Sequence, residues 1–243
     1  EGKHDLTPVI TVCRSIAEGL KPGDLVVIRS TLIPGTTREV ILPILEESGL
    51  QAGSDFFLAY SSERIAEGKA FYEFENMPAA VSGINEESAA RAHELISIVT
   101  KAPIIKASQM EVVEAAKVME NVSRDVNIAM SQEFARFARG LGIDIFEVIK
   151  VANTHQRVNL LLPGPGVGGY CLPNALYYLL PKAQEMGVEL PLLTTARQIN
   201  DSMPGFVAGL ALKNLSVPPQ EAELAVLGIA MKDFSNDDRI SPA

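Results

Sequence analysis

One cysteine lies in a glycine-rich segment suited to contact with a ligand. Cys171 comes shortly after residues 163–169 (PGPGVGG), which contain four glycines. Because glycine has no side chain, the backbone of such a segment can approach a ligand closely and offer its N–H groups. A thiol placed there could act as a nucleophile, whereas most free cysteines are small buried hydrophobic residues. These residues alone leave the two interpretations evenly balanced.

Three polar residues share one face of an expected helix. Glu114, Lys117 and Asn121 are spaced i, i+3 and i+7, and this spacing places them in one row. Lys117 and Asn121 could direct an ammonium and an amide at one oxygen and so stabilise an oxyanion. The alternative is an exposed salt bridge between Glu114 and Lys117, which the spacing alone favours. The apolar residues around the row favour a site.

Polar residues also follow two expected strands, at 25–30 and 56–60. They are Thr31 after the first strand and Glu63, Arg64 and Glu67 after the second. Open α/β sheets bind ligands at the carboxyl ends of their strands. Each group alone is commonly an ordinary helix cap or turn. The two groups together indicate a crevice.

The elements that would position these residues fall into three regions. Residues 1–107 alternate helical spacing with buried apolar runs, which predicts an α/β, doubly wound Rossmann-type sheet. The expected helices there are 8–20, 34–49 and 86–99, and the expected strands are 25–30, 56–60, 79–84 and 102–107. Residues 108–217 are mainly helical, with helices at 108–140, 144–152, 174–186 and 193–213. The apolar run 223–232 predicts the first strand of a second Rossmann-like domain.

Composition excludes several classes of protein. The net charge of -9 and the pI of about 4.9 argue against binding to nucleic acid or to an anionic membrane, because an acidic surface repels phosphate. No apolar run approaches the roughly 20 residues that cross a bilayer. The two cysteines predict no disulfide framework, and the three histidines show no metal-ligand spacing. A cytoplasmic protein without a metal is expected.

Several segments, in order along the chain, resemble the UDP-glucose/GDP-mannose dehydrogenase superfamily. They are IRSTLIPGTT (28–37), SERIAEGKA (62–70), EAAKVMENVSRDVNIAMSQEFA (114–135), PGPGVGGYCLP (163–173) and GIAMKDFSNDDRISPA (228–243). Together they extend over nearly the whole chain. Residues 152–169 look most like the branch that oxidises UDP-N-acetylhexosamines such as UDP-N-acetylmannosamine.

The resemblance implies three domains. Residues 1–107 would be the later part of an NAD-binding domain, residues 108–217 a helical dimerisation domain, and residues 218–243 the start of a UDP-sugar-binding domain. Residues 1–107 contain no G-x-G-x-x-G turn for a dinucleotide. We therefore expect sequence to be missing at both ends, and we expect the 243-residue chain alone to be inactive.

The family's activity implies a role for each matched residue. Two NAD molecules would take the C6 alcohol of the sugar to an aldehyde and then to a carboxylate, for use in polysaccharide biosynthesis by a homodimer or higher homo-oligomer. Cys171 would form a thiohemiacetal and then a thioester, while Lys117 and Asn121 stabilise oxyanions. Thr31 and Glu67 would lie near the nicotinamide and a water, with Glu67 as the base that promotes hydrolysis.

Further residues are implied as ligand contacts. Arg239, with Thr31 and Glu67, would bind the cofactor. The substrate contacts would be Glu63, Arg64, Lys117, Asn121, Arg157, Gly168, Gly169 and Lys232. One departure concerns the acid that the family has four positions after the cysteine, where this chain has Ala175. That change puts thioester hydrolysis, or the substrate, in question, and Asn174 is a possible partial substitute.

Other functions remain open at this point. UDP-glucose itself could be the substrate. A β-hydroxyacid dehydrogenase would use the same long helix with a lysine and an asparagine, but it would need no cysteine. A non-catalytic dimerising relative could bind the nucleotide sugar without oxidising it, as Ala175 would suggest.

Overall fold

The computed structural model of the chain describes residues 5–65, 68–230 and 237–243. Two predicted site residues, Glu67 and Lys232, therefore lie outside the described residues. The chain divides into two compact units, one made of residues 1–119 and 177–187 and the other of residues 120–176 and 188–243. The predicted boundaries of the three domains remain a prediction.

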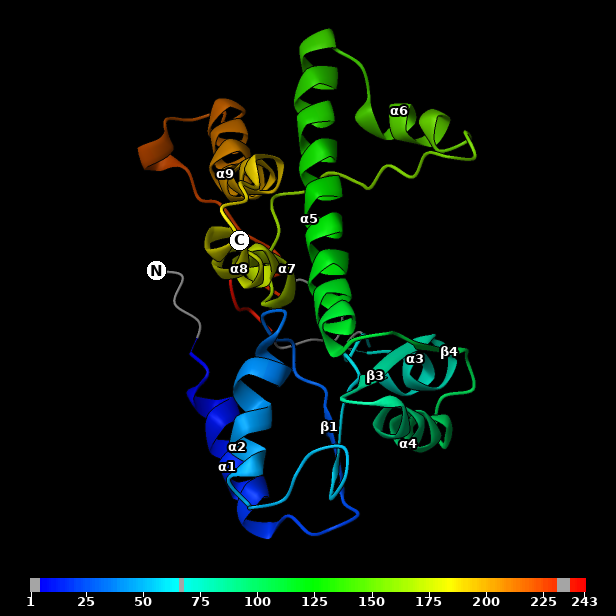
Figure 1. The fold of residues 1–243 in the computed structure, drawn as a ribbon. Coiled ribbons are helices and arrows are strands. Elements are labelled where there is room, and N and C mark those ends of the chain that lie inside the picture. The colour runs from blue at the N-terminus through cyan, green and yellow to red at the C-terminus, as the bar shows by residue number, and fades with distance from the viewer. Residues whose placement is uncertain (1–4, 66–67, 231–236) are drawn as a thin grey trace. The chain divides into compact units, whose positions relative to one another are not determined.

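A four-stranded sheet forms the centre of the first unit (Figure 1). The strands are β1 (Leu25–Ile28), β2 (Phe57–Tyr60), β3 (Ala79–Gly83) and β4 (Ile104–Lys106), and they lie in that order. The pairs β1–β2 and β3–β4 are parallel, whereas β2–β3 is antiparallel. The expected α/β fold is confirmed, and its sheet is mixed because β3 runs opposite to β2. The helix α3 (Ala70–Asn76) lies between these two strands in the sequence.

Successive residues of β2 belong to two different cores, as the alternation of a strand requires. Leu58 and Tyr60 are fully buried in one core, which they share with residues of α1 (Thr7–Gly19), the π-helical turn Thr37–Ile41 and α2 (Leu42–Glu46). Ala59 lies in the other core with residues of β3 and α4 (Glu86–Ser97). Helices thus cover both faces of the sheet.

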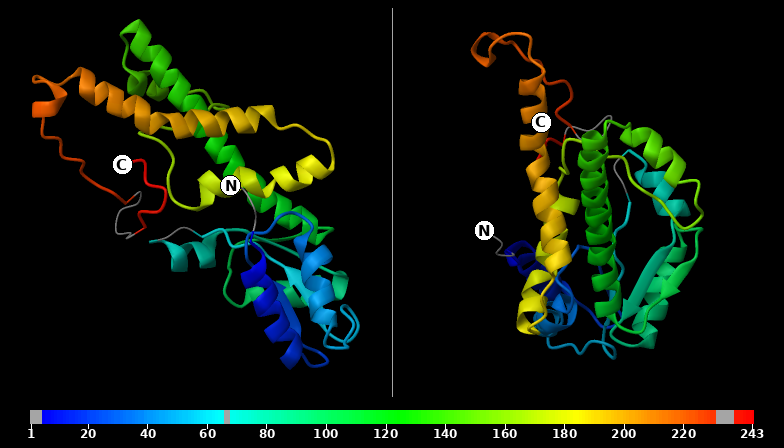
Figure 2. Two further views of the ribbon diagram at one scale, coloured as in Figure 1. Left: turned by 90° about the vertical axis from the view of Figure 1, so that its left-hand side faces the viewer. Right: turned by 90° about the horizontal axis from the view of Figure 1, so that it is seen from above.

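The long helix expected at 108–140 is confirmed as α5 (Met110–Leu141). It is followed by α6 (Ile145–Ala152), which the Asp144 side chain caps by accepting a hydrogen bond from the Phe146 N–H at 2.9 Å. The last long helix is α9 (Pro191–Lys213). In the second unit α5 and α9 are joined by a buried ion pair, in which Arg197 Nη1 lies 2.7 Å from Asp125 Oδ1. Figure 2 shows the two helices, α5 in green and α9 in yellow to orange.

The single helix expected at 174–186 is wrong. The chain instead forms α7 (Cys171–Ala175), a 3-10 turn (Leu176–Tyr178) and α8 (Leu180–Glu185). Pro181 is the physical reason, because proline has no N–H and its ring clashes with the carbonyl four residues earlier. Proline fits the first turn of a helix, so a new helix starts there.

The strand expected at 223–232 is also wrong over its described part, residues 223–230, which contains no strand. A strand is stable only when its N–H and C=O groups pair with a neighbouring strand. Within the described residues, Ile229 O instead accepts a hydrogen bond from the Ser241 hydroxyl at 2.7 Å. A short 3-10 turn (Pro219–Glu221) precedes this segment. None of the described helices is both long and apolar enough for a membrane crossing.

Candidate active site

The carboxyl ends of β1 and β2 lie at the same edge of the sheet. The two strands are parallel, with Ile28 opposite Tyr60, so the loops that follow them start side by side. An ion pair joins these loops, with Arg29 Nη2 lying 2.6 Å from Glu63 Oε2. Half-buried Thr31 belongs to the first loop. The two polar strand ends therefore lie side by side, and the crevice expected there stays a prediction.

Glu63 and Arg64 organise the second loop. Glu63 Oε1 accepts hydrogen bonds from the N–H groups of Arg64 and Ile65, at 2.7 and 2.9 Å. The Arg64 guanidinium donates to the carbonyl of Pro78 at 2.8 Å. Both side chains thus contact the protein itself, and their roles in binding substrate remain predictions.

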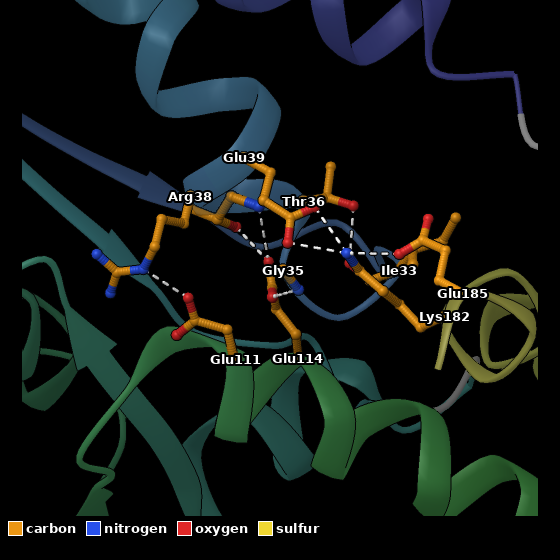
Figure 3. A network of polar contacts seen from close by, with 10 residues as sticks. Ile33, Gly35, Thr36, Arg38, Glu39, Glu111, Glu114, Lys182 and Glu185 are labelled. Carbon is orange, nitrogen blue, oxygen red and sulfur yellow. Dashed lines mark hydrogen bonds and ion pairs between the residues drawn. The ribbon is translucent and has the colours of Figure 1, made fainter. Parts of the chain in front are cut away.

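Glu114 does not form the salt bridge with Lys117 that its spacing favours. Its carboxylate is fully buried and accepts a hydrogen bond from the Gly35 N–H at 2.6 Å (Figure 3). It also accepts from the Thr37 N–H at 2.9 Å and from the Thr37 hydroxyl at 2.5 Å. A carboxylate facing several N–H groups at the start of a helical segment is electrostatically favourable. Glu114 therefore anchors the turn at residues 35–37 on α5.

A second contact joins α5 to the same turn. Arg38 Nε lies 2.6 Å from Glu111 Oε1 (Figure 3). Burial disfavours the charged form of Glu111, but the hydrogen bond and the charge of Arg38 outweigh it and hold the pKa of Glu111 below its ordinary value. The pair supports the anchor that Glu114 provides.

Lys117 and Asn121 lie on the continuous helix α5, where the i, i+4 spacing places them on one face. Both side chains are half-buried. Within the part of the chain that the structure describes, Lys117 makes no ion pair. Its ammonium therefore remains available to an anionic group, as the predicted role in stabilising an oxyanion requires.

Cys171 is exposed and begins α7. Two hydrogen bonds hold the glycine segment before it: Gly164 N–H donates to Gln132 Oε1 at 3.2 Å, and Gly169 N–H donates to Arg239 O at 2.9 Å. At Gly166, with φ of 146°, a Cβ atom would lie 3.1 Å from Pro242 Cβ. The segment is therefore ordered by α5 and by the last described residues, and it needs glycine at residue 166.

Arg239 lies beside the residues that lead to Cys171. Its guanidinium binds both oxygens of Asp237, at 2.7 and 2.8 Å, and lies 5.3 Å from the centre of the Tyr170 ring. Gly168 is buried within the same segment. Arg157 is exposed in the loop after α6, where its backbone N–H donates to His155 Nδ1 at 3.3 Å. The ligand contacts expected of these residues remain predictions.

The two cysteines have contrasting surroundings. Cys13 on α1 is only 2% exposed, and burial raises the pKa of its thiol. This is the environment of a structural cysteine. Cys171 is exposed. Only Cys171 is placed where a thiol can meet a ligand.

Ala175, at the position where an acid was expected, is also buried, with 2% of its surface exposed. Asn174, the possible substitute, donates its side-chain amide to Tyr170 O at 2.8 Å. Among the described residues, no group of three or more histidine, cysteine or acidic side chains could hold a metal ion.

Sequence reasoning missed the contact between Glu39 and Lys182, which lies beside the anchored turn. Lys182 Nζ is 2.8 Å from each carboxylate oxygen of Glu39. The two residues are 143 positions apart, so no local spacing could have paired them. Gln132, which holds the glycine segment, was missed for the same reason.

Two models of one family match consecutive parts of the chain. Residues 1–101 match the NAD binding domain of the UDP-glucose/GDP-mannose dehydrogenase family, and residues 111–202 match its central domain. A UDP-N-acetyl-D-mannosamine dehydrogenase of Pyrococcus horikoshii is 40% identical over 98% of this chain and 57% of its own length. A UDP-N-acetyl-D-glucosamine 6-dehydrogenase of Pseudomonas aeruginosa is 36% identical over 97% of this chain and 56% of its own length.

Solved structures agree with these matches. The structure of the UDP-D-ManNAc dehydrogenase from Pyrococcus horikoshii superimposes with a TM-score of 0.92 at 41% identity, over 99% of this chain and 57% of that one. A UDP-glucose dehydrogenase from Pyrobaculum islandicum gives a TM-score of 0.79 at 26% identity, over 87% and 50%. The chain spans somewhat more than half the length of the relatives it matches. It belongs to the UDP-glucose/GDP-mannose dehydrogenase family.

Proposed function

We propose that the natural protein containing this chain is a nucleotide-sugar 6-dehydrogenase. It oxidises the C6 alcohol of a UDP-N-acetylhexosamine, with UDP-N-acetylmannosamine as the preferred substrate, to the uronate with two NAD. The names of the relatives from Pyrococcus horikoshii and Pseudomonas aeruginosa support a UDP-N-acetylhexosamine. The product would serve polysaccharide biosynthesis.

The observation that carries this proposal is the contrast between Cys171 and Cys13. Cys171 is exposed two residues after a glycine segment that is held at both ends. Cys13 is buried, with a raised thiol pKa. A thiolate attacks an aldehyde far better than water does, and the thioester that follows keeps the acyl group activated. An exposed, well-positioned thiol is what the second oxidation needs.

The proposed steps use groups of this chain. The Cys171 sulfur adds to the aldehyde carbon and forms a thiohemiacetal, and loss of hydride from that carbon gives a thioester. Water then adds to the thioester, and the carbon–sulfur bond breaks to release the carboxylate and the thiol. Lys117 and Asn121 stabilise the oxyanions of these steps. Glu67, outside the described residues, is the proposed base for the water.

The described residues fit the expected cofactor. The parallel strands β1 and β2 bring two polar loops to one sheet edge, which is where open α/β sheets bind nucleotides. Thr31 in the first of these loops would contact the nicotinamide end, and Glu67 and Arg239 complete the proposed set. NAD, when bound, would accept the hydride removed in each oxidation.

We further propose a cytoplasmic homodimer or a higher homo-oligomer. Large hydrophobic side chains are exposed along the end of α5 and on α6, and such patches mark association surfaces. They are Phe134, Phe137, Leu141, Phe146 and Val151, which are 41–68% exposed. The first three are spaced i, i+3 and i+7, so they form one face of α5. A second copy of the chain would cover this face.

One observation favours a second candidate, a relative that binds the nucleotide sugar without oxidising it. Ala175 occupies the place of the family's acid, and its surroundings are buried. Neither it nor Asn174, whose amide is bonded to Tyr170 O, can act as an acid. This candidate predicts binding of the UDP-sugar without formation of NADH or uronate.

Replacement of Cys171 tests the proposed function. The natural protein should form two NADH per uronate from UDP-N-acetylmannosamine. The change Cys171→Ser should abolish uronate formation, whereas Cys13→Ser, in the buried core, should leave the reaction stoichiometry unchanged. Normal uronate production by Cys171→Ser would refute the covalent route. Binding of the UDP-sugar without NADH formation by the unsubstituted protein would favour the second candidate.

A further inference from the structure

Lys182 binds Glu39 and so connects two segments of the sequence, one near Thr31 and the other after Cys171. On α8, its ammonium lies 2.8 Å from both oxygens of Glu39 and 3.1 Å from Glu185 Oε2 (Figure 3). All three residues belong to the first unit. Hydrogen bonds to Glu39 and Glu185 raise the pKa of the Lys182 ammonium. Lys182 therefore stays charged, and its charge is matched by two carboxylates.

The Glu39 side of this contact lies on the turn that Glu114 anchors. The Glu39 N–H donates to Gly35 O at 2.9 Å. At Gly35, with φ of 99°, a Cβ atom would lie 2.9 Å from Glu39 Oε1 and 3.4 Å from Lys182 Cε. The positive φ favours glycine here, and a Cβ atom would displace the flexible end of the Glu39 side chain. The sequence of the turn is fitted to the contact with α8.

The turn is held from two directions. Glu114 of α5 accepts hydrogen bonds from the Gly35 and Thr37 N–H groups, and Lys182 of α8 binds Glu39, two residues further on (Figure 3). Thr31, the proposed contact of the nicotinamide, precedes this turn by four residues. The turn therefore directly adjoins the Thr31 loop in the sequence.

The Lys182 side of the contact is connected to the nucleophile through the chain. Lys182 follows Cys171 by eleven residues, and α7, a 3-10 turn and α8 form most of this stretch. Such short helices have little stability of their own, because the first turn of a helix is costly to form. The stretch therefore depends on contacts such as that of Lys182 to keep its conformation.

We propose that Lys182 and Glu39 form a positioning clasp, which holds the turn after the Thr31 loop and the stretch that follows Cys171 in their working conformations. Lys182 is a positioning residue here, since it acts through Glu39 and touches no reacting atom. The catalytic part of this inference rests on the proposed function, whereas the coupling between the two segments does not. An exposed ion pair adds little to global stability, so the clasp should affect local order.

Amide hydrogen exchange on the 243-residue chain tests the coupling from both sides. Lys182→Met, which keeps most of the length of the side chain and removes its charge, should speed exchange at residues 36–39 by about two- to fivefold, the range that the energy of an exposed ion pair allows. Glu39→Gln should speed exchange at residues 176–186 by a similar factor, since coupling is reciprocal. The double reversal Glu39→Lys with Lys182→Glu should restore slow exchange in both segments.

The matched control is Lys106→Met, which removes another exposed ion pair of the same unit, with Glu86 at 3.1 Å. It should change exchange in neither segment. Urea unfolding should show that each variant keeps nearly the stability of the unsubstituted chain. Exchange in Lys182→Met that equals the control, or a double reversal that restores nothing, would overturn the clasp. Glu39→Gln provides the same test if Lys182→Met does not fold.

The catalytic part is tested in the natural protein. Lys182→Met should lower kcat by about two- to fivefold and leave the KM for the UDP-sugar nearly unchanged. Lys182→Arg, which keeps the charge, should retain most of kcat. An unchanged kcat with altered amide exchange would overturn the positioning role and leave the coupling intact. These outcomes are independent of the Cys171→Ser result, which decides the proposed function itself.

Discussion

Thr37 donates both its backbone N–H and its hydroxyl hydrogen to one oxygen of Glu114, at 2.9 and 2.5 Å. The other oxygen of Glu114 accepts from the Gly35 N–H at 2.6 Å. The carboxylate is fully buried, so water cannot replace these bonds. Glu114 of α5 thus anchors the turn that follows the Thr31 loop.

Replacement of Glu114 by glutamine should destabilise the chain markedly. One carboxylate oxygen becomes an NH₂ group that faces backbone or hydroxyl donors, and buried donors are left without an acceptor. We expect the free energy of unfolding to fall by about 2–4 kcal/mol, since hydrogen bonds to a charged group are strong and buried unpaired donors are costly. Urea unfolding measures this change.

The control for this prediction is Glu111→Gln on the same helix. Glu111 is partly exposed and pairs with Arg38, whose side chain is 42% exposed. We expect a loss of less than about 1 kcal/mol. Equal losses for the two variants would contradict the anchoring role of Glu114.

Replacement of Arg197 by methionine should leave a buried carboxylate without its cation. The side chains of Arg197 and Asp125 are 4% and 5% exposed. Breaking such a pair typically costs about 3–5 kcal/mol. The control is Asp201→Asn. The Asp201 side chain, which also pairs with Arg197, is 60% exposed, so its replacement should lower the free energy of unfolding by less than about 1 kcal/mol. Similar losses of unfolding free energy in the two variants would contradict the importance of the buried pair between Arg197 and Asp125.

The loss of unfolding free energy caused by Arg197→Met should depend on pH in a defined direction. Burial raises the pKa of Asp125 above its ordinary value of 3.8, and Arg197 counteracts part of that increase. A carboxyl with a raised pKa in the folded state contributes stability at acid pH and loses it as pH rises through that pKa. Without Arg197 the pKa of Asp125 rises further. The loss of unfolding free energy should therefore become smaller as the pH falls from 7 to 5. A loss that becomes larger as the pH falls from 7 to 5 would contradict the prediction.

Alkaline pH should destabilise the chain through Tyr60. Burial, and next the negative charge of Glu114, raise the pKa of this phenol well above its ordinary value of 10. The hydroxyl donates to Ser30 O at 2.9 Å. Because the pKa of Tyr60 is raised in the folded state, only the unfolded state ionises as the pH rises above 10. The stability that Tyr60 contributes below pH 10 is therefore lost at higher pH. Urea unfolding should show that, between pH 9 and pH 11, Tyr60→Phe loses less unfolding free energy than the unsubstituted chain.

Regular elements were predictable because their signals are local. Helical spacing indicated α5, and buried apolar runs indicated the strands of the sheet. The helix expected at 174–186 failed because Pro181 starts a new helix. The strand expected at 223–232 failed over residues 223–230 because a strand depends on a neighbour that no local pattern identifies.

The candidate site was predictable only in part, for a related reason. Residue type and glycine context selected Cys171, but only the fold distinguishes its exposed thiol from the buried thiol of Cys13. The spacing on α5 placed Lys117 beside Asn121, yet it paired Glu114 with the wrong partner. The true partners of Glu114 lie 77 and 79 positions away, beyond the reach of helical periodicity.

Thiol alkylation should separate the two cysteines of the folded chain. Cys171 is exposed, whereas Cys13 is 2% exposed and has a thiol pKa raised by burial. Alkylation requires a thiolate that the reagent can reach, so Cys13 reacts only when its surroundings open. With iodoacetamide near neutral pH, we expect Cys171 to react at least about a hundredfold faster, because openings of a buried core cost several kcal/mol. Peptide mass spectrometry resolves the two sites, and in urea the two rates should converge. Comparable rates in the folded chain would show that Cys171 is not the accessible nucleophile on which the proposed covalent route depends.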